Sequence, residues 1–146
     1  MAGAQVPIHG RDHAPDGPDP IGPIVLEVKV FADDKAVSVG DGRLIRATTK
    51  DLDGYVLTEV EAYVTTVGSA GTALIQIRNV TQAVDMLSTR INIDANEFHS
   101  ADAATQPVIN AANDDVAYKD QIAIDVDAIG SGSKGLGVNF YFAPGV

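Results

Sequence analysis

Two histidines near the N-terminus form the first arrangement that could do chemistry. His9 and His13 have the spacing His-x-x-x-His, which on a helix places two imidazoles on one face, where they could bind a metal ion together. Pro7 and Pro15 bracket the pair, and proline inside a helix removes a hydrogen bond and clashes with the preceding turn. We therefore expect no helix here and no metal site of this kind.

A second group that could bind a cation is acidic and lies between residues 114 and 127. Ca²⁺ prefers several carboxylate and carbonyl oxygens, and this stretch holds five aspartates: Asp114, Asp115, Asp120, Asp125 and Asp127. They lack the spacing of an EF-hand. Asp125 and Asp127 are two residues apart, which is also the spacing of solvent-facing residues on a strand. A structural cation is thus an alternative, and we expect no metal ion and no cofactor.

The residue types of hydrolytic enzymes are poorly represented. Paired carboxylates can cleave glycosides, but such sites usually lie in clefts lined with aromatic side chains, and the chain is 5% aromatic with no tryptophan. No Gly-x-Ser-x-Gly elbow or Walker loop is present. The absence of cysteine excludes Cys nucleophiles and Cys-based zinc sites. Ser88 and Ser100, near His99, are more simply loop residues, so we expect a protein that is not an enzyme.

Length and composition indicate one folded domain. The chain has 146 residues, of which 45% are hydrophobic, enough for a single small core. Its net charge of −10 disfavours nucleic acid as a partner, because a binder must neutralise phosphates with Lys and Arg. No apolar stretch approaches the ~18 residues of a membrane-spanning helix, and the N-terminus lacks the pattern of a signal peptide. We expect neither insertion into a membrane nor export by that route.

The first 23 residues predict an extended arm. Five of the seven prolines lie there, namely Pro7, Pro15, Pro18, Pro20 and Pro23. Proline fixes φ and pushes the preceding residue towards extended conformations, so residues 1–23 favour neither a helix nor a central strand. A disordered tail is the alternative. An extended segment whose backbone groups are unpaired is well suited to lie along a neighbouring subunit.

Residues 24–146 predict an all-β domain. Apolar and polar residues alternate with period two, which is typical of strands, over 24–31, 55–67, 73–80, 89–94, 121–127 and 136–142. Shorter strands are expected at 36–39, 44–47 and 107–109, a turn at 40–42, a hairpin loop at 68–71 and one helical turn within 95–106. Many short strands with frequent turn signals indicate a single β-sandwich or jelly-roll-like domain.

The arm also carries a resemblance to a known group of proteins. The run from His13 to Ile21, with Pro15, Gly17, Pro18, Asp19 and Pro20, resembles a short element common in tail-fibre and minor tail proteins of tailed phages. Asp16 stands where the usual element has the first glycine of a pair. The segments 60–64, 75–78, 86–89, 120–127 and 134–138 resemble the small β-domain that recurs in phage fibres, and a similar domain occurs in capsid decoration proteins.

The resemblance implies a structural protein of the virion, made in the host cytoplasm. It implies a homotrimer whose arms organise the contact to the particle, so its partners would be copies of itself and a tail protein or the major capsid protein. A component of the host surface is a further candidate partner. In a trimer, copies of His13 could meet near the axis. A minor tail or tail-fibre-like component is the preferred interpretation, and a capsid decoration protein that trimerises on the shell is the alternative. A carbohydrate-binding module is a second alternative, against which the low aromatic content argues.

Overall fold

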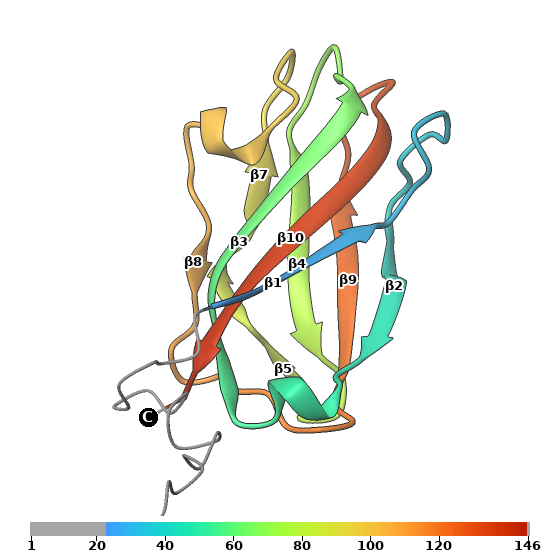
Figure 1. Ribbon diagram of the computed structural model, residues 1–146. Coiled ribbons are helices and arrows are strands. Elements are labelled where there is room, and N and C mark those ends of the chain that lie inside the picture. The colour runs from blue at the N-terminus through green and yellow to red at the C-terminus, as the bar shows by residue number, and fades with distance from the viewer. Residues whose placement is uncertain (1–22, 146) are drawn as a thin grey trace, which may run out of the picture.

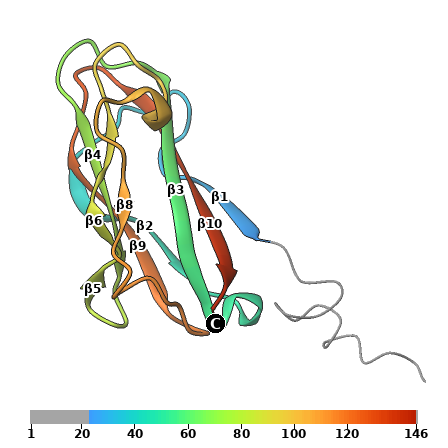
Figure 2. The ribbon, with the colours of Figure 1, turned by 90° about the vertical axis from the view of Figure 1, so that its left-hand side faces the viewer.

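The computed structural model describes residues 23–145, which form two antiparallel sheets packed face to face (Figures 1 and 2). The first sheet has the order β1-β10-β3 and contains β1 (Ile24–Lys29), β10 (Lys134–Pro144) and β3 (Tyr55–Thr66). The second has the order β2-β9-β4-β5 and contains β2 (Gly40–Ala47), β9 (Gln121–Ala128), β4 (Ala73–Asn79) and β5 (Val84–Asp85). The predicted all-β class is therefore confirmed.

Three further strands and two short helices complete the domain. β7 (Ile91–Ile93) pairs with β4, while β6 (Leu87–Thr89) and β8 (Val108–Ile109) form a ladder of two strands. The helical turns are η1 (Lys50–Leu52) and η2 (Ser100–Asp102), both of the 3₁₀ type. Along the part of the chain that the structure describes, no helix is long and apolar enough to cross a membrane.

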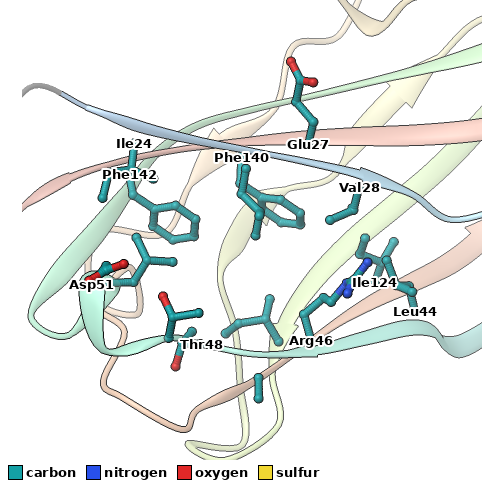
Figure 3. Close-up of a pocket in the computed structure, with 15 residues that line it drawn as sticks. Ile24, Glu27, Val28, Leu44, Arg46, Thr48, Asp51, Ile124, Phe140 and Phe142 are labelled. Atoms are coloured by element: carbon teal, nitrogen blue, oxygen red, sulfur yellow. The ribbon is translucent and has the colours of Figure 1, made fainter.

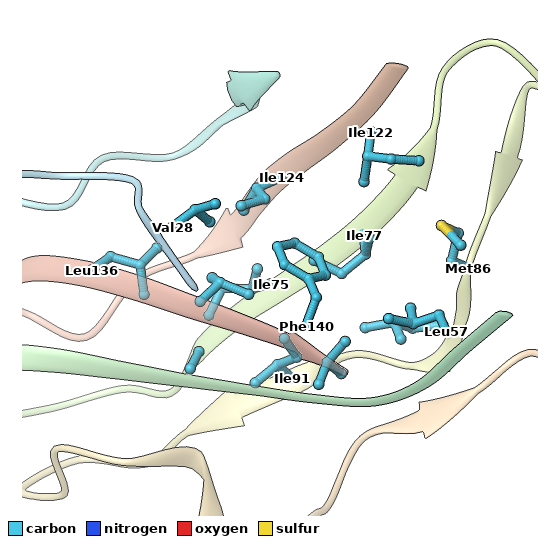
Figure 4. Close-up of a cluster of buried hydrophobic side chains, with 14 of the residues drawn as sticks. Val28, Leu57, Ile75, Ile77, Met86, Ile91, Ile122, Ile124, Leu136 and Phe140 are labelled. Atoms are coloured by element: carbon cyan, nitrogen blue, oxygen red, sulfur yellow. The ribbon is translucent and has the colours of Figure 1, made fainter. Parts of the chain in front are cut away.

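The core is built from the inward faces of the long strands. The predicted alternation holds on β4, β9 and β10, whose inward residues are all buried (Figure 4): Ile75, Ile77, Ile122, Ile124, Val126, Leu136, Val138, Phe140 and Phe142. The period of two is retained because each strand turns one face to the opposite sheet and the other face away from it. These residues join β1 and β3 in one contiguous apolar cluster.

The first four strands alternate between the sheets, which corrects the expected hairpin at residues 68–71. β3 pairs with β10 and β4 pairs with β9, so the loop between β3 and β4 crosses from one sheet to the other. The first glycine of this loop lets it pass close to the loop between β9 and β10. Gly68 packs directly on the backbone of Gly130, and a Cβ atom on Gly68 would lie 2.7 Å from the Gly130 Cα atom. The loop is thus seated on the β9–β10 loop, to which Ser69 also donates a backbone hydrogen bond at Ser131.

Two irregularities correct the expected strand faces and bounds. In β3 the ladder with β10 shifts register opposite Tyr141 and Phe142, which leaves Thr58 as an extra residue. Such a bulge reverses the alternation on one side of it. Leu57 is therefore buried, and Val56, which regular alternation from Val60 would turn inward, is half-buried. The expected strand 36–39 is also absent, and β2 begins only at Gly40. The predicted turn at 40–42 is instead an irregular part of this strand.

The predicted domain boundary falls at the edge of the described residues. β1 begins at Ile24, the first residue of the expected domain. Of the predicted arm, residues 1–23, all but Pro23 lie outside the described residues. The arm residues named from the resemblance, His13, Pro15, Gly17, Pro18, Asp19, Pro20 and Ile21, therefore stay predictions, as does a role for His9.

Candidate docking groove

An apolar groove lies between β1 and β2, the edge strands of the two sheets on the same side of the sandwich (Figure 3). It encloses about 360 Å³, within the size range of ligand pockets. Its apolar lining comes mainly from β1, β2, β9 and β10 and comprises Ile24, Leu26, Val28, Leu44, Ala47, Leu52, Ile122, Ile124, Phe140 and Phe142. Its polar lining comprises Glu27, Arg46, Thr48, Thr49 and Asp51. The groove is an apolar cleft with charged groups around it.

The β1 wall is made of side chains that face the opposite sheet, and the first two of them are only partly buried. Ile24, Leu26 and Val28 share one face of the strand, because each lies opposite a buried residue of β10. Val28 is 5% exposed, whereas Leu26 is 37% exposed and Ile24 is half-buried. The two sheets therefore close over the end of β1 and leave its beginning open, at the point where the chain enters the domain.

The β2 wall combines one apolar and one charged side chain. Leu44 lies opposite Ile124 and Arg46 lies opposite Ile122 in the ladder with β9, so both take the side of the strand that faces the groove. Arg46 is exposed, and none of residues 23–145 forms an ion pair with it. A long basic side chain can cover apolar surface with its methylene groups while its head stays in water. This wall thus offers both an apolar contact and a positive charge.

The backbone edges beside the groove are available for pairing. Val30 donates its N–H to the carbonyl of Leu136 in β10 at 2.8 Å. The backbone N–H and C=O groups of successive strand residues point alternately to the two sides of the strand. Val25, Glu27 and Lys29 therefore turn their backbone groups away from β10. On that side β1 has no partner strand within the described chain, and β2 likewise pairs only with β9. The outer edge of β3 is different, because Val64 and Leu57 donate to the loop carbonyls of Phe98 and Asp114. Unpaired strand edges are templates for another segment.

β2 is held in place by a buried carboxylate on the far side of its sheet. Asp125 accepts hydrogen bonds from Gly42 N–H at 2.7 Å, from Arg78 Nε at 2.7 Å and from Arg78 Nη2 at 3.0 Å. Burial raises the pKa of Asp125, but the hydrogen bonds from Arg78 and Gly42 together outweigh it and lower the pKa below its usual range. Asp125 therefore ties β2, through Gly42, to β4 across the strand that separates them.

A second buried carboxylate organises the end of β4 and the start of β9. Asp120 accepts from Asn79 Nδ2 and Gln82 Nε2, each at 2.9 Å, and from Ala117 N–H at 3.0 Å. Burial raises the pKa of Asp120, and the hydrogen bonds from Asn79, Ala117 and Gln82 reverse that effect, so its pKa is lowered. The Asp120 carboxylate thus replaces water as the partner of buried donors.

The five aspartates considered for a cation do not come together. Asp120 and Asp125 are occupied by the contacts just described, and Asp127 pairs with Arg90 at 3.0 Å. Within residues 23–145 no three His, Asp or Glu side chains are placed to hold a metal ion. The described residues of the stretch 114–127 therefore give no support to the alternative of a calcium site.

A polar cluster on the outer face of the first sheet was not predicted. Glu61 accepts from Asn139 Nδ2 at 3.0 Å and from Tyr141 Oη at 2.9 Å, and His99 Nε2 lies 3.8 Å from its second oxygen. The hydrogen bond from Asn139 lowers the pKa of Glu61, burial opposes it, and Tyr141 and His99 lower it further. Because Asn139 lies far from Glu61 in the sequence, no local spacing could indicate this cluster.

The serines considered with His99 lie in regular elements instead of the loops that we expected: Ser88 is in β6 and Ser100 begins η2. Ser100 is buried, and its Oγ accepts from Ala62 N–H at 3.0 Å. Ser88 Oγ donates to the carbonyl of Val108 at 3.3 Å, and His99 Nδ1 accepts from Ala101 N–H at 3.0 Å. Each of these groups therefore stabilises a loop or strand edge.

Sequence reasoning also missed the groove itself. Its signal is weak: Arg46 occupies an inward position within the otherwise apolar residues 44–47. The chain matches no family model, no curated protein and no solved structure in comparisons with all three. Any interpretation of function rests on the geometry of the groove and on the sequence of the arm.

Proposed function

We propose that the chain is a non-enzymatic structural component of a tailed-phage virion, of the minor tail or tail-fibre type, that forms a homotrimer and attaches through its N-terminal arm. The groove between β1 and β2 carries this proposal. It combines core-facing apolar side chains with two strand edges available for pairing, and it opens where the arm joins the domain. Surfaces of this kind recognise extended segments by strand addition and by side-chain pockets.

The strand order supports assignment of the domain to the jelly-roll type. A jelly roll consists of eight strands in two sheets built from two Greek keys, and its order interleaves early and late strands. Here β1 lies beside β10, and β9 lies between β2 and β4. β8 follows the outer edge of β3 (Figure 1), the place of the fourth strand of the first sheet. The run His13 to Ile21 supports the assignment to phage tails by resemblance.

Sedimentation equilibrium of the full chain tests the proposed assembly. We expect a trimer at micromolar concentration, with an interface larger than that of transient complexes. A variant lacking residues 1–22 is expected to fold but to lose attachment to particles. A monomeric full chain, or normal attachment by the truncated chain, would contradict the proposal.

Quantitative mass spectrometry of purified particles tests the place in the virion. Tens of copies or fewer per particle are expected for a tail component, whereas hundreds would indicate a decoration protein on the shell. Contact with the host surface, which we propose as a secondary role, predicts that the isolated domain binds host cells. Binding to a glycan array without any assembly would favour the carbohydrate-binding module instead.

A further inference from the structure

The groove has a shape and chemistry that fit a short extended segment with alternating apolar residues. Ile24 and Leu26 of β1 are two residues apart and both line the groove, as does Leu44 of β2. Figure 3 shows Ile24 and Leu44 on its two walls. A partner segment must therefore present apolar side chains at the same period of two, because successive side chains of an extended chain point to opposite sides. Asp51 lines the cleft at the end where Ile24 lies (Figure 3), so positive charge next to the apolar residues would be favourable there.

The chain itself contains one segment with these properties. Val6 and Ile8 are separated by Pro7, so in an extended conformation both apolar side chains take the same side. Proline is accepted on the edge of a sheet because its missing N–H need not pair. Arg11 follows three residues after Ile8, so it can supply positive charge for Asp51.

The length of the arm favours a groove on another copy. Four prolines lie between Ile8 and β1, and they favour polyproline II geometry, which extends by ~3.1 Å per residue. Over the 15 residues from Ile8 to Pro23 this amounts to roughly 45 Å. A strand of six residues, such as β1, is only about 20 Å long. An arm extended in this way would carry Val6 and Ile8 past the groove of its own domain.

We infer that the groove between β1 and β2 binds the segment Val6–Ile8 from the arm of a neighbouring copy of the chain. This inference rests on the proposed function and deepens it, because it names the contact that joins the subunits. Val6 and Ile8 cover Leu26 and Leu44, and the positive charge of Arg11 meets Asp51. Each subunit thus donates one arm and accepts one, which closes a ring when the rotation between subunits allows it.

Disulfide trapping tests the inference cleanly because the chain contains no cysteine. A chain with Ile8→Cys and a chain with Leu44→Cys are co-expressed, one of them with a tag that changes its mass, and are mildly oxidised. We expect the mixed disulfide in at least about tenfold excess over the control, because a seated pair of thiols has an effective concentration in the millimolar range. The matched control replaces Leu44→Cys by Ala111→Cys, at an exposed residue that does not line the groove.

Two outcomes would overturn the inference. A chain that carries both Ile8→Cys and Leu44→Cys and closes only an intramolecular disulfide would show that the arm folds back, for example at Pro15-Asp16-Gly17, into its own groove. A yield of mixed disulfide no higher than that of the Ala111→Cys control would show that the segment does not occupy the groove at all.

A second pair of variants leaves the domain untouched and separates this inference from the proposed assembly. The double substitution V6S/I8S is expected to weaken self-association by about a hundredfold, because two buried aliphatic side chains are lost, whereas A2S/A4S changes it little. If the full chain is a trimer that V6S/I8S leaves intact, the groove inference is wrong and the proposed assembly stands. If the full chain is a monomer, both are wrong.

Discussion

Replacing Asp125 by asparagine should loosen the strand that forms one wall of the groove. The carboxylate of Asp125 is 7% exposed and accepts two hydrogen bonds from Arg78 and one from Gly42. Asparagine keeps the shape of the side chain but offers one acceptor oxygen and directs an N–H₂ group at one of the former donors. The substitution therefore removes a charge and leaves a donor facing a donor.

The size of the effect follows from the burial of the two partners. Removing one partner of a fully buried ion pair costs about 3–5 kcal/mol. The Arg78 side chain is 31% exposed, so water can solvate it after the substitution. The expected loss in the free energy of unfolding is therefore smaller, about 2 kcal/mol, which is the value for hydrogen bonds to charged groups. Asp127 provides the matched control. Its ion pair with Arg90 joins side chains that are 31% and 43% exposed, and Asp127→Asn should cost less than about 1 kcal/mol.

The difference should disappear in acid. Because the pKa of Asp125 is lowered in the folded state, its contribution is complete above the unfolded value of ~3.9. The contribution is lost as pH falls through the lower folded pKa. Once the carboxyl group is protonated, the unsubstituted protein resembles Asp125→Asn. We therefore expect the two proteins to differ in stability at neutral pH and to converge at the acid end.

Urea unfolding of the parent chain, Asp125→Asn and Asp127→Asn, at neutral pH and again near pH 3, measures these differences directly. Hydrogen exchange of the Gly42 amide adds a local test, since this group loses its acceptor. A deficit of Asp125→Asn that stays the same in acid would refute the ionic explanation. A loss in Asp127→Asn as large as that in Asp125→Asn would refute the role of burial.

Three other substitutions test the core, a turn and a buried network. Ile77→Ala removes a fully buried side chain and should lower the free energy of unfolding by about 3 kcal/mol in urea titrations. Gly135→Ala should reduce the melting temperature far more than Gly132→Ala. Both residues have a positive φ, +69° and +79°, but a Cβ atom would meet neighbouring backbone only at Gly135. Equal reductions in melting temperature would contradict the role of this contact. Asp120→Ala should cost about 2–3 kcal/mol, because the buried Asn79 loses its acceptor, and an unchanged unfolding midpoint would contradict it.

The sequence predicts the core well, because its pattern is local. Ile75 and Ile77, or Leu136 and Phe140, point inward wherever a strand is regular and one face meets the opposite sheet. The pattern fails where pairing with a distant strand intervenes. Thr58 is an extra residue only in relation to β10, so no reading of residues 55–67 alone could show that Leu57 is buried instead of Val56.

The groove escapes prediction for the same reason. Leu26 and Leu44 look like ordinary core residues in the sequence, and their exposure arises because β1 and β2 are the last strands of two different sheets. Strand order is set by pairings between segments far apart in the chain. The arm, in contrast, stands out by composition alone, since proline acts on the backbone locally.

The pairing of β1 with β10 also sets the order of events during synthesis. The first strand of the domain needs residues 137–142 as its partner, so the first sheet cannot form until residue 142 has left the ribosome. Contacts this distant in sequence slow folding, with times of milliseconds to seconds for domains dominated by them. A truncated or stalled chain would lack the β1 wall of the groove. In the proposed assembly, only chains that include β10 would then present a groove that another subunit can enter.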